Sequence, residues 1–89
     1  MGRSKHERAI RRNRRSVRLE DLVAVLRDAG FVCRLRRSGH WTCVHPASKA
    51  RCNIAPAHGR GDAFLLVVYV DESLRALDEH RLRGERDGR

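Results

Sequence analysis

The chain has 89 residues, enough for one small domain, and carries a formal net charge of +9 at pH 7. It has no run of about 18 apolar residues that could span a membrane, and its start lacks the apolar segment of a signal peptide. We therefore expect a cytoplasmic protein whose three cysteines are reduced thiols rather than a disulfide framework.

Residues 1–16 form a strongly basic arm. The first 18 residues hold eight Arg or Lys side chains and a single Glu. A block of like charge suits a polyanion, and the arm has too few apolar residues for a membrane-binding helix, so nucleic acid is the expected partner. The arm cations expected to contact RNA are Lys5, Arg8, Arg11, Arg12, Arg14 and Arg15. Alternatively, the arm is an extension that only increases solubility or packs on a helix. The sequence is compatible with either a helical or a non-helical arm.

An amphipathic helix follows the arm. Apolar residues recur there at spacings of three and four, which is the period of one helix face; they are Leu19, Leu22, Val23, Leu26 and Ala29. Arg18 stands at the N-cap although its side chain cannot accept a bond from the first amides. Val17 and Leu22 occupy the positions of a hydrophobic staple, and Gly30 is expected just past the helix end.

The next segment predicts a β-hairpin. A three-residue loop of Arg37, Ser38 and Gly39, with Gly39 in the left-handed conformation, pairs Arg36 with His40 and Cys33 with Cys43. Alternation along the two strands then predicts a core face of Phe31, Cys33, Leu35, Trp41 and Cys43. The opposite, open face is expected to carry Arg34, Arg36, His40 and Thr42.

A third strand and a second helix complete the domain. The segment "RCNIA", residues 51–55, predicts the strand, and Pro56 stops it. Val67, Val70, Leu74 and Leu77 then continue at helical spacing, which predicts a helix from about Val67 to Leu82. Residues 83–89 are interpreted as a frayed, flexible tail. Residues 17–82 are thus expected to form an α+β domain of order α-β-β-β-α, with both helices on one face of a three-stranded antiparallel sheet.

This order, with "SGHWTCVHP" at its centre and "HGRGD" before the last helix, resembles the HicA family of bacterial toxins. The family motif has Gly-Ser-His where this chain has Ser38-Gly39-His40, and a proline is common where Val67 and Val68 open the last helix. The resemblance implies a fold like that of double-stranded-RNA-binding domains and an endoribonuclease, or mRNA interferase, that cleaves messenger RNA. It places the catalytic histidine at His40 and implies a cognate HicB-like antitoxin as partner. The alternative is a non-catalytic RNA-binding module of the same fold.

The residue types fit metal-independent RNA cleavage. That reaction needs a base for the 2′-hydroxyl and an acid for the leaving oxygen, and histidine can serve because it titrates near neutral pH. His40 is the candidate base and His58 the candidate acid, while Arg34, Arg36 and Arg37 would bind phosphate. The competing interpretation is that His40 is simply a polar surface residue.

Two alternative roles, base stacking and zinc binding, involve residues between Trp41 and His58. Trp41 could stack on a base, although its register favours the core. Zinc could bind a set of Cys43, His45, Cys52 and His58, but the spacing lacks a Cys-x-x-Cys motif. We therefore expect no metal and no cofactor.

Overall fold

The computed structural model describes residues 5–55 and 64–87 as three helices and a three-stranded antiparallel sheet. The strands are β1 (Val32–Leu35), β2 (Trp41–Val44) and β3 (Arg51–Ile54), in the order β1-β2-β3. The helices are α1 (Lys5–Arg12), α2 (Leu19–Asp28) and α3 (Val67–Asp87). The expected α+β order from α2 to α3 is confirmed, with one further helix in front of it.

The two ends of α2 form as expected. Arg18 is the N-cap without a side-chain cap hydrogen bond, and both Val17 and Leu22 are buried. Gly30 follows the helix with φ +98°, a left-handed conformation that favours glycine. A Cβ on Gly30 would also lie 2.7 Å from Nε2 of His45. Two independent constraints, backbone conformation and space, therefore require a glycine at this position.

The strand register agrees with the expected hairpin. Cys33 faces Cys43, and Cys43 in turn faces Cys52, so the three cysteines form one row across the sheet. All three are buried free thiols, and hydrogen bonding to Cys33 and Cys52 raises the pKa of the Cys43 thiol. They pack as small apolar side chains between the sheet and the helices.

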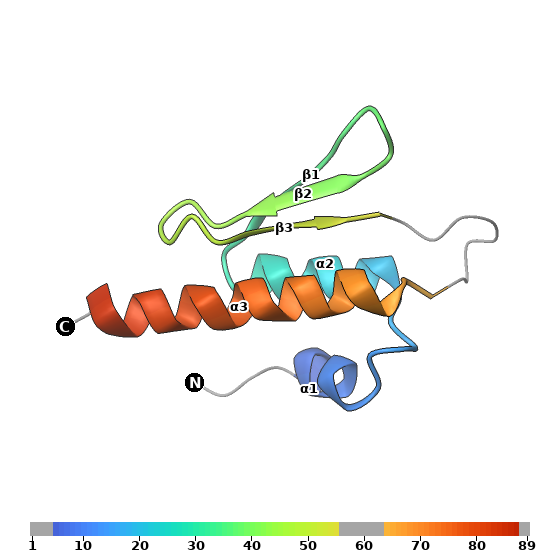
Figure 1. The fold of residues 1–89 in the computed structure, drawn as a ribbon, viewed down its shortest axis with the longest axis horizontal. Helices are drawn as coiled ribbons and strands as arrows, with labels where there is room; N and C mark the ends of the chain where they lie inside the picture. The colour runs from blue at the N-terminus through green and yellow to red at the C-terminus, as the bar shows by residue number, and fades with distance from the viewer. Residues whose placement is uncertain (1–4, 56–63, 88–89) are drawn as a thin grey trace.

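The molecule has three layers (Figure 1). Helices α2 and α3 lie side by side under one face of the sheet, and α1 lies on their far side. The largest fully buried apolar side chains come from both helices and from β3; they include Leu22, Leu26, Ile54, Val70 and Leu77. In the described part of the chain, no helix is long and apolar enough to cross a membrane. The other face of the sheet carries no layer of helix or strand from these residues.

Two expectations about element limits and burial are wrong. Leu35 belongs to the core face by alternation but is 60% exposed, because β1 ends there near the hairpin tip, away from the helices (Figure 1). The last helix continues past Leu82 to Asp87, so most of the segment expected to be frayed is helical. Arg83 supports this extension through an ion pair with Glu79 at 2.5 Å and a hydrogen bond to the carbonyl oxygen of Ser48.

Candidate functional site

The hairpin turn positions His40 at the open face of the sheet. The backbone N–H of Arg36 donates to the carbonyl oxygen of His40 at 2.8 Å, and Gly39 N–H donates to that of Arg36 at 2.9 Å. Gly39 has φ +90°, so the expected three-residue loop is confirmed. With this register the His40 side chain is exposed rather than packed in the core.

His40 lines an open hollow of about 380 Å³ together with residues of the hairpin loop, of the β2 and β3 segments and of α3. This feature, called the His40 hollow below, is lined by Arg36, Ser38, His40, Thr42, Asn53, Ala55 and Tyr69. Thr42 and Asn53 are directly paired across β2 and β3, and alternation puts both on the face opposite the buried cysteines. Tyr69 reaches the hollow from the first turn of α3. The hollow therefore combines an imidazole, a guanidinium, an amide and an aromatic ring.

The three arginines expected to bind phosphate differ in position. Arg36 lines the hollow, Arg34 is exposed on the same face opposite Thr42, and Arg37 is exposed in the turn. Among the described residues, none of the three has a carboxylate partner. Their charges are therefore available to an anion on this face.

Asn53 and Tyr69 were not among the residues expected in the site. Asn53 could have been found, because alternation around the buried pair Cys52 and Ile54 turns it to the open face. Tyr69 lies in an apolar stretch and gave no such signal, since its approach to β3 depends on how α3 packs. The candidate acid, His58, lies outside the described residues.

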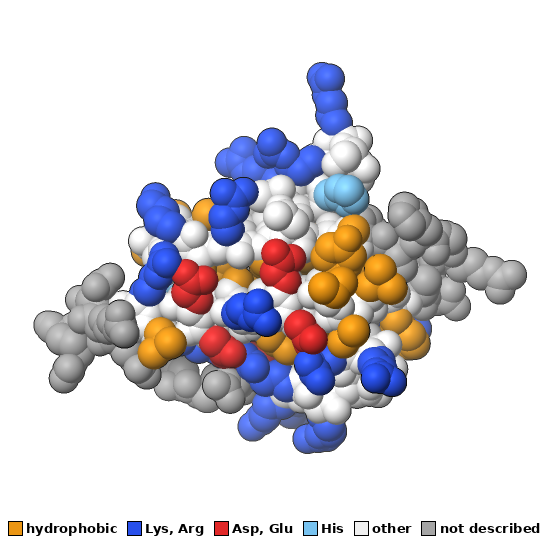
Figure 2. Space-filling model, in the orientation of Figure 1, with side chains coloured by type: hydrophobic (Ala, Val, Ile, Leu, Met, Phe, Trp, Pro, Cys, Tyr) orange, Lys and Arg blue, Asp and Glu red, His pale blue; other side chains and the backbone are white. Residues whose placement is uncertain are grey.

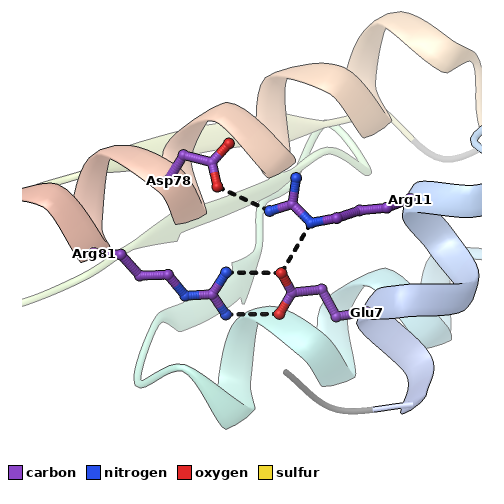
Figure 3. Close-up of polar contacts among 4 residues, drawn as sticks. All are labelled: Glu7, Arg11, Asp78 and Arg81. Carbon is purple, nitrogen blue, oxygen red and sulfur yellow. Dashed lines mark hydrogen bonds and ion pairs between the residues drawn. The ribbon is translucent and has the colours of Figure 1, made fainter. Parts of the chain in front are cut away.

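The expected basic arm is part of the folded unit. Glu7 of α1 is only 2% exposed, and Arg81 of α3 donates to both of its carboxylate oxygens, at 2.6 and 2.7 Å (Figure 3). Arg11 donates to Glu7 at 3.0 Å and to Asp78 at 2.9 Å. Hydrogen bonding to Arg81 holds the pKa of Glu7 below its ordinary value. Ile10, on the same helix, is buried in the core.

This packing engages two of the arm cations that were expected to contact RNA. Arg11 is engaged with α3, and Arg14 pairs with Asp71 of α3 at 2.5 Å. The other expected RNA contacts are exposed and have no acidic partner among the described residues; they are Lys5, Arg8, Arg12 and Arg15. The boundary expected between an arm at 1–16 and a domain at 17–82 therefore does not separate two independent units.

Base stacking by Trp41 and a zinc site, the two remaining alternatives, find little support in the described residues. Trp41 packs partly against the core, and the guanidinium of Arg27 lies 5.6 Å from its ring centroid. His45, a member of the alternative zinc set, stacks on His80 with ring centroids 3.7 Å apart and accepts the N–H of Ala47 at 3.1 Å. Within residues 5–55 and 64–87, no group of three or more His, Cys, Asp or Glu side chains is arranged so that it could hold a metal ion.

Hydrophobic side chains gather on the surface at the start of α3 (Figure 2). The exposed ones are Phe64, Leu66, Val67 and Val68. They directly precede Tyr69, so this apolar surface borders the His40 hollow.

No family model, no curated protein and no solved structure matches the chain. The function is therefore argued from the hollow itself.

Proposed function

We propose that the chain is a HicA-like toxin, an endoribonuclease that cleaves messenger RNA in the cytoplasm and has a fold like that of double-stranded-RNA-binding domains. The observation that supports this best is the exposed His40 beside Arg36 in one hollow. A histidine can accept a proton near neutral pH, and an arginine binds a phosphate through paired hydrogen bonds. The alternative, a non-catalytic RNA-binding module, predicts RNA binding without cleavage.

The proposed reaction is a transesterification at phosphorus. His40 accepts the proton of a ribose 2′-hydroxyl, and the 2′-oxygen attacks the adjacent phosphorus. The bond from phosphorus to the 5′-oxygen breaks, and this oxygen takes a proton from an acid, for which His58 is the candidate. The products are a 2′,3′-cyclic phosphate end and a 5′-hydroxyl end. Arg36 would stabilise the charge on the two non-bridging phosphate oxygens.

Single-stranded RNA is the preferred substrate in this proposal. Domains with the proposed fold that grip duplex RNA present lysines at the start of their last helix. Here α3 starts with the exposed apolar residues Val67 and Val68, followed by Asp71 and Glu72. An apolar and then acidic surface favours unstacked bases over the phosphates of a duplex.

Purified chain should cleave a labelled single-stranded RNA in the presence of excess chelator, since the proposed base and acid are its own side chains. The same RNA annealed to its complement should be cleaved more slowly. The measurement is the initial cleavage rate, resolved by gel electrophoresis. Tight binding without cleavage would favour the RNA-binding module, and cleavage that stops with chelator and returns with a divalent metal would contradict the proposed chemistry.

An antitoxin that blocks this site should place carboxylates against the open sheet face, because buried arginines without partners are costly. Arg34→Glu should then weaken the complex by about tenfold or more, since the new charge repels such carboxylates. Arg8→Glu, on the exposed side of α1, serves as the matched control. The measurement is the dissociation constant of the purified complex. Equal affinities for both variants would contradict this docking surface.

A further inference from the structure

The His40 hollow has two chemically different sides. Arg36 and His40 meet through the backbone hydrogen bond that closes the hairpin, so a cation and a proton acceptor share the side nearest β1. Asn53, Ala55 and Tyr69 lie on the side of β3 and α3, where there is no charged side chain among the residues that line the hollow. Thr42 stands between them on β2.

We infer that the hollow is a subsite for one nucleotide, with its phosphate beside Arg36 and His40 and its base between Asn53 and Tyr69. This inference rests on the proposed function, because it takes the ligand to be single-stranded RNA. Two strand spacings, about 10 Å, separate β1 from β3. That span, and the volume of about 380 Å³, suit a single nucleotide rather than a helical segment.

Tyr69 is suited to hold a base by stacking. Its side chain is half-buried and packs against the hydrophobic core, so the ring is fixed while part of it lines the hollow. A ring that is already immobilised loses little conformational entropy when a base stacks on it. Stacking on an aromatic side chain accepts any base, so Tyr69 should contribute affinity without base preference.

Asn53 is suited to discriminate between bases. Its side chain is exposed on the open face, and its amide offers both a donor and an acceptor. Unstacked RNA bases present such paired groups along their edges, which differ from base to base. A base that matches the amide makes two hydrogen bonds, whereas a mismatched base leaves polar groups unpaired. Asn53 should therefore be a specificity-determining residue.

The test measures binding of full-length protein to four short single-stranded RNAs that differ at one base. Each RNA carries a 2′-O-methyl group at that nucleotide, so that binding is separated from cleavage. Asn53→Ala should reduce the preference between the best and worst base from about tenfold or more to within about twofold. Asn13→Ala is the matched control, since Asn13 is also an exposed asparagine but lies between α1 and α2.

Tyr69→Ala should weaken binding of all four RNAs by about tenfold, while Tyr69→Phe should stay within about twofold of the wild type because it keeps the ring. Thermal unfolding checks that the variants fold. If Tyr69→Ala does not fold, the result for Asn53→Ala decides whether the hollow is a nucleotide subsite, because Asn53 is exposed and its replacement leaves the core intact.

The subsite and the proposed function can fail separately. RNA cleavage that needs His40, together with an unchanged base preference in Asn53→Ala, would overturn the subsite and leave the ribonuclease in place. Base-selective binding that is lost in Asn53→Ala, without any cleavage of the unmodified RNA by the wild type, would support the subsite and reject the ribonuclease. Absence of RNA binding by the wild-type chain would overturn both.

Discussion

His40→Ala should abolish RNA cleavage while leaving the fold intact. Loss of a general base costs about 10²–10⁴-fold in rate, and no other described histidine lines the hollow. The side chain is exposed, so its removal should change the free energy of unfolding by less than about 0.5 kcal/mol. The two measurements are the single-turnover cleavage rate at saturating RNA and the thermal unfolding midpoint.

His6→Ala is the control for this variant, because His6 is an exposed histidine on α1. It should cleave at the wild-type rate. Induced expression of the two variants and of the wild type, with growth and messenger-RNA integrity followed in parallel, extends the comparison to cells. A His40→Ala protein that still cleaves near the wild-type rate would contradict the assignment of the base. One that fails to fold would indicate a structural role for His40.

Glu7→Ala should have the largest effect on stability. The carboxylate is 2% exposed and holds Arg81 and Arg11 together. Its removal leaves Arg81 without this partner and beside Arg11, which still pairs with Asp78. Removing one member of a buried ion pair costs about 3–5 kcal/mol. Because both arginine side chains are about one third exposed, water moderates the loss, and we expect about 2–4 kcal/mol. Denaturant unfolding monitored by circular dichroism measures it.

The comparison for Glu7 is Glu20→Ala, which removes an exposed carboxylate from the first turn of α2. Its cost should stay near 0.5 kcal/mol, the size of a helix-dipole interaction at the surface. The folded-state pKa of Glu7 is lowered, so its contribution is present above its ordinary value of 4.5 and is lost as the pH falls through the folded-state value. The difference in free energy of unfolding between the wild type and Glu7→Ala should therefore be largest at neutral pH. Equal stabilities of the two variants would contradict a structural role for α1.

The structural role of α1 also determines which experiments can examine the arm. Deletion of residues 1–16 would remove Glu7 and Ile10 from the folded unit, so a loss of RNA binding would reflect unfolding as well as lost charge. Reversal of exposed cations such as Arg8 and Arg12 leaves this packing in place. A change in the salt dependence of RNA affinity in those variants would then report their phosphate contacts.

Much of the fold could be predicted because its determinants are local. The spacing of apolar residues defines α2, and the positive-φ glycines Gly30 and Gly39 mark the helix end and the hairpin turn. Once Gly39 set the loop length, the period of two along each strand determined which residues face each other, including Cys33 and Cys43. The same alternation turned His40 and Arg36 to the open face, so this part of the candidate site was also predictable.

The rest depended on contacts between segments far apart in the chain. A single Glu in a run of cations gave no sign that it would be buried. The approach of Arg81, 74 residues away, together with Arg11 makes that burial tolerable. Leu35 follows the alternation of the core face, yet it is exposed because the hairpin rises away from the helices at that end of β1. The sequence by itself thus determined the strands, the turn and the face that carries His40, because these follow from backbone conformation and local periodicity. Only the tertiary structure decided that α1 belongs to the core and that Tyr69 joins His40 in one hollow, because both depend on how α3 packs.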